Sequence, residues 1–340
     1  MQRFKIAMGL ALIAAVPALP AAVPATMQAA AIDRPGGPEV LTLHTLPVPK
    51  PGADEVLIEM NTAGVGPWDL DVREKLDYWK NRKYPLVLGV DGSGTVAAVG
   101  SAVHGFKVGD AVYAYVWDNP KGGFYAEYVA VAAGAVGHVP AGMTLRDAGA
   151  GAVGSLTALQ GIDDALHLRS GETLLIHGAA GSVGSLALQF AKLRGARVLA
   201  TASGDDGAAL VRGLGADAVI DGRHGDIREA ARAFAPNGVD AVLVLAGGDA
   251  QQACMDALRS GGRAAYPSGV HPEPKARSGT TVVSYDAIAA PAQYARLNEA
   301  IEQAKLKVPI AAEYPLADAA KAHERMAAGH VLGKVVLRIR

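Results

Sequence analysis

The sequence predicts an α/β protein in which a small, mostly β domain precedes a doubly wound parallel sheet. Its 340 residues are too many for one ordinary core and suit two domains of about 150 residues each. Up to about Ala150, short β-like runs are separated by turn signals. From Gly171 onward, short apolar runs alternate with helical stretches, which is the pattern of βαβ units.

Composition narrows the class of protein. Hydrophobic residues make up 50% of the chain and charged residues 19%, so we expect a substantial core rather than disorder. The net charge of −1 argues against a nucleic-acid partner, because such proteins normally carry clustered basic residues. Cys254 is the only cysteine, so the sequence excludes intramolecular disulfides and cysteine-based zinc clusters.

Residues 1–25 have the pattern of an export signal. Arg3 and Lys5 form a basic start, residues 6–16 are apolar, and small residues precede a cleavage site after Ala25. Three prolines interrupt the second half, which disfavours the alternative of an uncleaved membrane anchor. We therefore expect a cleaved signal peptide and a periplasmic or secreted protein. The other alternative is a cytoplasmic protein whose translation starts at Met27.

The first domain is predicted to occupy residues 27–150. Strand-like runs lie at 55–60, 94–99 and 110–115. Pro-Gly, Asp-Gly and Gly-Asp pairs separate them, and Asp91-Gly92 is one of the expected turns. This part of the chain therefore reads as a small β domain.

The second domain is predicted to occupy residues 151–288, followed by a C-terminal segment at 289–340. The expected strands of the second domain are 173–177, 197–201, 216–220, 240–245 and 262–266. The first two begin 24 residues apart, which suits a strand, a helix and a parallel strand. The C-terminal segment contains a helix near 318–328, with Asp318 as candidate N-cap, and a final strand at 334–339.

A glycine-rich turn follows the first strand of the second domain. Gly178, Gly181 and Gly184 recur at three-residue intervals between that strand and an amphipathic helix. A strand, a glycine turn and a helix in this order form a dinucleotide-binding fingerprint of the Rossmann type. The glycines let the backbone approach a pyrophosphate, whose charge is favoured at a helix N-terminus. His177, which ends the buried strand, is expected to pack rather than to bind a ligand.

The residues after the second strand favour NADPH over NADH. Asp205 lies 21 residues after Gly184, near the spacing at which an acid binds the ribose 2′-hydroxyl of NADH. The strand is expected to end at Thr201, however, and the small residues that follow, including Ser203, leave room for a 2′-phosphate. Asp205 then begins the next helix, where an acid suits the helix dipole. NADPH is the expected cofactor, with NADH as the alternative.

Nine segments along the chain form a recognisable series: AGVGPWD (63–69), LGVDGSG (88–94), VGDAVYAY (108–115), GGFYAEYV (122–129), SLTALQ (155–160), HGAAGSVG (177–184), LGADAVID (214–221), GGRAAYPSG (261–269) and GHVLGKVVL (329–337). In this order they resemble the quinone oxidoreductase, or zeta-crystallin-like, branch of the medium-chain dehydrogenase/reductases. The resemblance implies a Rossmann domain and a GroES-like catalytic domain that the C-terminal segment completes. It also implies an active site in the cleft between them. A homodimer is the usual expectation for this family.

The motif and the resemblance together nominate site residues. The cofactor-binding candidates are Thr157, Gly178, Ala180, Gly181, Ser182, Val183, Gly184, Thr201, Ser203, Tyr266 and Ser268. Among them Ser203 would face the 2′-phosphate, and Thr157, Tyr266 and Ser268 would lie near the nicotinamide. Asp69 and Trp68 are the catalytic candidates, in the cleft for substrate and nicotinamide.

The chain departs from its zinc-dependent relatives at the metal site. Those relatives carry ligands where this chain has Gly66-Pro67 and Gly89-Val90-Asp91, so no metal is expected. Without a metal to lower the pKa of a hydroxyl, alcohol oxidation is difficult, whereas reduction of an electron-poor double bond is not. The expected activity is NADPH-dependent reduction of a quinone or an α,β-unsaturated carbonyl. The alternatives are an enoyl-thioester reductase and a non-catalytic NADPH-binding sensor or structural protein.

Other departures concern side chains that contact ligands. Gly66 stands where the family often has Asn, and Asp71 where it has Tyr or Lys. Gly207 replaces a Lys that faces the 2′-phosphate, and Arg212 is the candidate substitute. Lys334 is a family feature to which the sequence assigns no role.

An aromatic cluster suits a small, apolar, electron-poor substrate. Its members are Trp68, Tyr78, Trp79 and Tyr84. Ordinary packing of a β domain that has few aromatic residues is an equally good explanation of the cluster.

Overall fold

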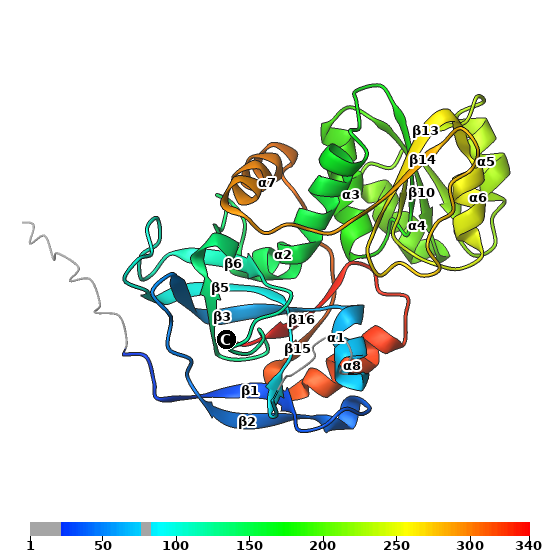
Figure 1. Ribbon diagram of the computed structural model, residues 1–340. Coiled ribbons are helices and arrows are strands. Elements are labelled where there is room, and N and C mark those ends of the chain that lie inside the picture. Colours follow the sequence, from blue (N-terminus) through cyan, green and yellow to red (C-terminus); the bar gives the residue numbers. More distant parts are fainter. Residues whose placement is uncertain (1–21, 76–82) are drawn as a thin grey trace, which may run out of the picture.

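The computed structural model describes residues 22–75 and 83–340 (Figure 1). Most of the predicted signal peptide, together with Tyr78 and Trp79 of the aromatic cluster, lies outside the described residues. Within the described ranges, none of the helices combines the length and the apolar character needed to cross a membrane. Residues 22–25 are exposed and lead directly into the first strand, β1 (Thr26–Ile32).

The first domain is built on two sheets that share a hydrophobic core. The larger sheet has the order β15-β16-β3-β5-β6-β8, with β7 also paired to β3, and the smaller sheet has the order β2-β1-β4. The strands are β1, β2 (Leu41–Pro47), β3 (Glu55–Val65), β4 (Leu86–Val87), β5 (Asp91–Val99), β6 (Ala111–Tyr115), β7 (Tyr128–Ala132), β8 (Val136–His138), β15 (Ile310–Pro315) and β16 (Lys334–Arg338).

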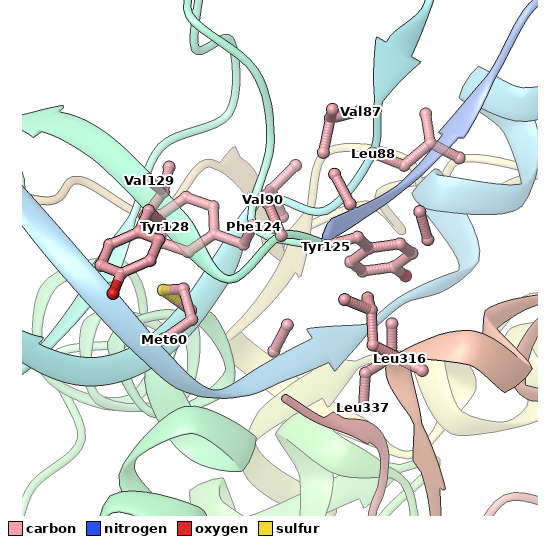
Figure 2. Close-up of a cluster of buried hydrophobic side chains, with 14 of the residues drawn as sticks. Met60, Val87, Leu88, Val90, Phe124, Tyr125, Tyr128, Val129, Leu316 and Leu337 are labelled. Atoms are coloured by element: carbon pink, nitrogen blue, oxygen red, sulfur yellow. The ribbon is translucent and has the colours of Figure 1, made fainter. Parts of the chain in front are cut away.

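The C-terminal segment returns to this domain and completes its larger sheet. Strand β16 pairs antiparallel with β3, and β15 pairs parallel with β16. Leu316 and Leu337 of this segment lie in the same buried cluster as Met60 and Phe124 (Figure 2). Burial of these side chains together joins the C-terminal segment to the core of the first domain.

The second domain is a six-stranded parallel sheet in the order β11-β10-β9-β12-β13-β14. Its strands are β9 (Thr173–His177), β10 (Arg197–Ala202), β11 (Ala218–Asp221), β12 (Val239–Val244), β13 (Leu258–Pro267) and β14 (Thr281–Tyr285), and its helices include α3 (Ser182–Leu193), α4 (Gly204–Gly213), α5 (Ile227–Phe234) and α6 (Ala250–Asp256). The chain proceeds outward from β9 in one direction and from β12 in the other, as in doubly wound folds. The predicted α/β class is confirmed.

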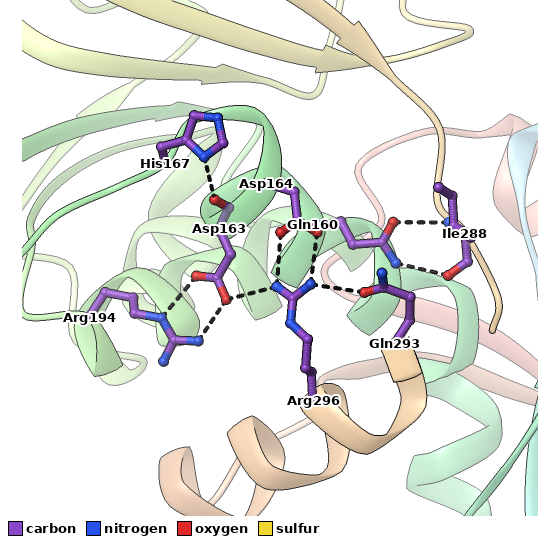
Figure 3. A network of polar contacts seen from close by, with 8 residues as sticks. All are labelled: Gln160, Asp163, Asp164, His167, Arg194, Ile288, Gln293 and Arg296. Atoms are coloured by element: carbon purple, nitrogen blue, oxygen red, sulfur yellow. Dashed lines mark hydrogen bonds and ion pairs between the residues drawn. The ribbon is translucent and has the colours of Figure 1, made fainter. Parts of the chain in front are cut away.

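A helix at the junction of the domains is fixed by polar side chains (Figure 3). Helix α2 (Leu145–Gln160) packs on β5 of the first domain and on α3 of the second. The side-chain amide of Gln160 exchanges two hydrogen bonds, of 2.9 and 3.0 Å, with the backbone of Ile288, ahead of α7 (Pro291–Ala304). The charged pairs of the same network are Asp163–Arg194, Asp163–Arg296 and Asp164–Arg296.

Some element boundaries differ from the expected ones. The expected turn at Asp91-Gly92 is wrong, because both residues lie inside β5. Gly92 is needed there for close approach, since a Cβ would come within 3.2 Å of Cα of Ala63 on β3. Strand β10 continues one residue beyond Thr201, and β14 has no counterpart among the predicted strands. The exposed residues of β14 lack the apolar run that reveals the buried strands.

Candidate functional site

The glycine-rich turn joins β9 to α3 at the carboxyl end of the parallel sheet. Gly178 has a φ of +84°, a left-handed conformation that favours glycine. A Cβ on Gly184 would overlap the carbonyl oxygen of Gly178 and lie 2.7 Å from Cα of Ala179. Only glycine at 184 therefore lets the helix and the turn pack this closely. Gly181 is the N-cap of α3 and has no side chain to bond the first-turn N–H groups, which remain available to an anion.

A cavity of about 820 Å³ lies against this turn. Its walls come from the ends of β9 and β10, from the loops that follow β11 and β12 together with helices α5 and α6, and from residues 330–332 of the first domain. The predicted cofactor residues that line it are Gly178, Ala180, Gly181, Thr201 and Ser203. Its size is typical of cofactor sites, and its place at the carboxyl ends of parallel strands is where open α/β sheets bind ligands.

The other predicted cofactor residues lie outside the lining of this cavity. They are Thr157, Ser182, Val183, Gly184, Tyr266 and Ser268. Thr157 is buried in α2, where its hydroxyl donates to a carbonyl of its own helix and its carbonyl accepts from the hydroxyl of Tyr285 at 3.0 Å. Ser268, just beyond β13, lies 3.3 Å from the hydroxyl of Ser284. Gly184 contributes by packing, because it brings α3 onto the turn.

His177 is buried and also faces the cavity, which the sequence does not predict. Its Nδ1 lies 3.0 Å from the hydroxyl of Thr201, and the same hydroxyl accepts a hydrogen bond of 3.0 Å from the backbone N–H of Gly178. Burial lowers the pKa of His177, so the ring is neutral. The Thr201 hydroxyl thus ties the end of β10 to the start of the glycine turn.

The β10–α4 turn forms the end of the cavity that a ribose would face. Ser203 lines the cavity as N-cap of α4, and its side chain makes no capping hydrogen bond there. Gly204 follows with a φ of +74°. Asp205 and Asp206 are exposed in the first turn of α4 and do not line the cavity. Strand β10 ends at Ala202, one residue after its expected end at Thr201.

Arg212 cannot take the role suggested for it. It lies in the last turn of α4, about 13 Å along the helix axis from Ser203, and is exposed outside the cavity lining. Gly207 itself is buried. A Cβ there would contact Leu332, Ala202 and Ala180 at 3.5–3.7 Å, so a segment of the first domain already covers this face of α4.

Three basic side chains that the sequence does not nominate line the cavity: Arg223, Arg228 and His330. Arg223 and Arg228 follow β11, and His330 precedes β16 in the other domain. Arg228 is paired with Asp256 at 2.6 Å. Arg223 could have been nominated from the sequence, because it lies just after a parallel strand, where ligands bind in α/β sheets. His330 could not, because its place at the cavity depends on how the two domains pack.

The segment before β16 is docked on the glycine turn. The backbone N–H of Gly333 donates to the carbonyl of Ala180 at 2.9 Å, and Gly333 forms a parallel bridge with Gly181. Close by, Nε2 of His330 lies 2.9 Å from a carboxylate oxygen of Asp206 on α4. The first domain therefore contacts the nucleotide cavity at both the turn and α4.

Asp69, a catalytic candidate, is buried in the first domain and is 1% exposed. Its Oδ2 accepts hydrogen bonds from the backbone N–H of Gly66 at 2.8 Å and from the hydroxyl of Tyr125 at 3.1 Å. It thereby holds the N-terminus of helix α1 (Pro67–Glu74). Burial raises the pKa of Asp69 to about 7, against the opposing effect of the hydrogen bond from Gly66. Asp69 does not line the cavity.

A chain of buried polar groups extends from Asp69 to Arg73. Nε2 of His323, on α8 (Ala319–Ala327), lies 3.2 Å from the hydroxyl of Tyr125, and its Nδ1 lies 3.0 Å from Nη1 of Arg73. Because guanidinium can only donate, Nδ1 is an acceptor and Nε2–H donates to Tyr125. Burial, followed by the charge of Arg73, lowers the pKa of His323 to about 3. The network joins α1 to α8 across 250 residues of sequence.

Lys334, which has no role assigned from sequence, is buried beside Asp91. Nζ lies 3.5 Å from Oδ2 of Asp91, and the two side chains are 2% and 0% exposed. The same oxygen accepts a hydrogen bond of 3.2 Å from the backbone N–H of Val153 in α2. The pair thus joins β16, β5 and α2.

Trp68, the other catalytic candidate, is half-buried and lies over Gly66. A Cβ on Gly66 would overlap the indole ring, so a side chain at 66 and this position of Trp68 exclude each other. The ring lies 5.1 Å from Nζ of Lys334, at cation–π distance, and contacts Trp117 edge to face with centroids 6.4 Å apart. Trp117 is the aromatic partner that the sequence does not predict.

Comparison with known proteins identifies both domains. A model of the alcohol dehydrogenase GroES-like domain matches residues 52–141, and a model of zinc-binding dehydrogenases matches residues 214–337. The GroES-like assignment is thereby confirmed. Within the described part of the chain, no group of three His, Cys, Asp or Glu side chains is arranged to hold a metal ion.

Two curated relatives and three solved structures illustrate the likeness. Quinone oxidoreductase of Pseudomonas aeruginosa is 32% identical over 318 residues, covering 89% of this chain and 96% of the relative. Quinone oxidoreductase of Mus musculus is 30% identical over 317 residues, covering 89% and 95%.

The structures cover nearly the whole chain. The quinone oxidoreductase from Coxiella burnetii has a TM-score of 0.83 at 29% identity and covers 93% of this chain and all (100%) of its own. An NAD-dependent alcohol dehydrogenase scores 0.85 at 30% identity, covering 92% and 100%. A mycobacterial protein solved in complex with NADPH scores 0.80 at 28% identity, also covering 92% and 100%. The chain therefore belongs to the quinone oxidoreductase-like branch of the medium-chain dehydrogenase/reductase superfamily and is an oxidoreductase.

Proposed function

We propose that the protein is an NADPH-dependent, metal-independent reductase of quinones or α,β-unsaturated carbonyl compounds. The observation that carries this proposal is the cavity of about 820 Å³ against the glycine turn. The turn brings backbone N–H groups to the cavity wall, and Gly184 permits the close packing that places them there. These features fit the pyrophosphate of a dinucleotide.

The residues at the ribose end support NADPH. Ser203 faces the cavity, and Arg223 and His330 add basic groups near it, whereas the acids of α4 lie outside its lining. An acid positioned to bind the 2′-hydroxyl is the usual mark of an NAD site. Of the three solved structures described above, one is in complex with NADPH and one is named an NAD-dependent enzyme, so the choice depends on the residues of this chain.

The residues at the metal position of zinc-dependent relatives support reduction of a double bond. Gly66 and Val90 have no ligand atoms in their side chains, and Asp91 is bonded to Lys334 and to the backbone of Val153. Such a site lacks the means to lower the pKa of an alcohol hydroxyl. Bound NADPH supplies a hydride, which an electron-poor carbon accepts. The protein contributes orientation and a partly apolar cleft, and water supplies the proton.

Turnover of NADPH with a panel of acceptors tests this proposal. The panel contains quinones, enones and an enoyl thioester, and loss of the NADPH absorbance is followed while binding is measured on the same samples. We expect turnover with a quinone or an enone. A Gly181→Val variant is the matched control, because its Cβ would lie 3.5 Å from the nearest atom and its side chain would fill the cavity wall.

The other outcomes separate the alternatives. Turnover with the thioester alone would identify an enoyl-thioester reductase. Tight NADPH binding without turnover of any acceptor would identify a non-catalytic binding protein.

A further inference from the structure

The first turns of α4 carry acids and a glycine but no basic side chain. This helix therefore offers no cation to a 2′-phosphate. Gly207 has no side chain, and the face of the helix around it is covered by Leu332. Arg212 lies at the far end of the helix, outside the cavity lining. If the protein prefers NADPH, the positive charge that selects it must therefore come from other elements.

Arg223 is a basic residue of the cavity wall whose guanidinium makes no ion pair with the described residues. Its backbone is held in place, because its N–H donates to the carboxylate of Asp221 at 2.7 Å. The preceding residue, Gly222, donates to the carbonyl of Ala202 at 3.2 Å. Arg223 is thus attached next to the end of β10, immediately before Ser203, with its charged group available to a ligand.

His330 reaches the same end of the cavity from the first domain. Its Cε1 lies 3.5 Å from the position of a Cβ on Gly204, so the ring is next to the β10–α4 turn. Nε2 is engaged by both carboxylate oxygens of Asp206, at 2.9 and 3.1 Å. Nδ1 makes no hydrogen bond with the described residues, and the ring lines the cavity. Asp206 thus engages one ring nitrogen and leaves the other, Nδ1, without a partner among the described residues.

The backbone around His330 is constrained in a way that holds the ring over the cavity. His330 has a φ of +47°, which is unusual for a residue with a side chain. Arg325 of α8 donates to the carbonyls of Gly329 and His330 at 2.9 and 3.0 Å. On the other side, Gly333 is bonded to the glycine turn. Both flanks of the residue are thus anchored.

We propose that Arg223 and His330 together bind the 2′-phosphate of NADPH, in place of a basic side chain from α4, and so determine the choice of cofactor. The two residues come from different domains, so the phosphate contacts both domains while the nucleotide is bound. Asp206 orients His330 through its contact with Nε2. The carboxylate of Asp206 is therefore not available to bind the 2′-hydroxyl of NADH. This inference rests on the proposed function and specifies its cofactor contacts.

Binding measurements on the full chain test it without requiring turnover. The Kd values of NADPH and NADH are compared for the wild type and for Arg223→Ala and His330→Asn variants; asparagine is chosen because it tolerates a positive φ. Adenosine 2′,5′-bisphosphate and adenosine 5′-monophosphate serve as fragments that differ only in the 2′-phosphate. Arg212→Ala is the matched control, an arginine of α4 outside the cavity.

We expect each of the two variants to weaken NADPH and the bisphosphate by about 10- to 100-fold, with changes below about twofold for NADH and the monophosphate. Arg212→Ala should change none of these values. Equal affinity of the wild type for NADPH and NADH, or equal losses for both in the variants, would overturn the inference and leave the dinucleotide site intact. Failure of the wild type to bind either dinucleotide would overturn the proposed function itself.

Discussion

Nζ of Lys334 lies 3.5 Å from Oδ2 of Asp91, in an ion pair that is almost fully buried and joins the C-terminal strand to the first domain. A buried pair of this kind tolerates the loss of one partner poorly, because the other charge remains without compensation. The pair also bonds to α2 through Val153, so it links the sheet of the first domain to the helix that leads into the second.

Replacing Lys334 should therefore destabilise the protein strongly. We expect Lys334→Met to lower the free energy of unfolding by about 3–5 kcal/mol. The matched control is Arg338→Met on the same strand, where the ion pair with Glu313 is solvent-exposed and should cost less than about 1 kcal/mol. Denaturant unfolding of both variants measures the difference. Equal midpoints for Lys334→Met and the wild type would show that the pair has no structural role.

Asp69 and His323, two of the buried titratable groups near α1, should make opposite contributions to the pH dependence of stability. Asp69 has its pKa raised to about 7, so the folded state binds a proton that the unfolded state releases near pH 4, and its contribution to stability falls as the pH rises from about 4 to 7. His323 has its pKa lowered to about 3, so its contribution falls as the pH drops from about 6.5 to 3.

Variants separate these two contributions. In Asp69→Asn the Asp69 contribution is lost, so stability should fall more steeply than in the wild type as the pH drops from about 7 to 4. In His323→Gln the His323 contribution is lost, so stability should fall less steeply than in the wild type over the same range, the slopes differing by at most about 1.4 kcal/mol per pH unit. Unfolding by denaturant at a series of pH values gives both slopes. Parallel curves for the two variants would contradict these protonation states.

Alanine substitutions at two glycines of the turn should have different effects on stability and on NADPH binding. Gly184→Ala introduces a Cβ that overlaps the carbonyl of Gly178, so we expect a loss of about 1–3 kcal/mol in stability together with weaker NADPH binding. Gly181→Ala meets no atom closer than 3.5 Å and should keep its stability, while its methyl group hinders the approach of the pyrophosphate. Thermal unfolding and NADPH titration of both variants test this. Similar behaviour of the two would show that close packing at 184 is not required.

Gly66 and Trp68 should be energetically coupled. A Cβ at 66 would overlap the indole ring, so Gly66→Ala alone should displace Trp68 and destabilise the protein. In the Gly66→Ala/Trp68→Ala double variant the overlap is gone, and we expect a coupling energy of about 1–2 kcal/mol in a double-mutant cycle. Additive effects would mean that the ring does not lie over Gly66 in solution.

The mature N-terminus is a further prediction. We propose cleavage after Ala25 and export; the structure describes residues 22–25 as exposed, directly before β1. Intact mass measurement of the protein from the producing cells should give a chain that begins at Thr26, and Ala25→Phe should block the processing. A chain that begins at Met27 and is recovered from the cytosol would contradict export.

The homodimer that the family resemblance implies also stays a prediction.

The parts of the fold and site that the sequence predicts are those encoded locally. Strand β9, Gly178 and Gly184 lie within 12 residues of one another, and their spacing directly reports a turn that approaches a helix. The pair Asp91-Gly92 shows how a local pattern can also give a wrong prediction. The pair has turn composition, but its glycine serves close packing against β3 inside a strand.

The parts that the sequence does not predict depend on distant segments. His330 reaches α4 across 124 residues, and Arg73 reaches His323 across 250. No local pattern distinguishes such residues from ordinary surface or core positions. Arg223 is intermediate, because its place just after a parallel strand is visible in the sequence while the cavity beside it is not.

Calorimetric titration of the purified full chain with NADPH, repeated with NADH, measures whether the glycine-turn cavity binds this cofactor. We expect binding of one NADPH per chain, with NADH bound at least about tenfold more weakly. The NADPH signal should be lost in the Gly181→Val variant. Absence of NADPH binding by the folded wild type, or unchanged binding by Gly181→Val, would contradict the assignment of the glycine-turn cavity as the cofactor site.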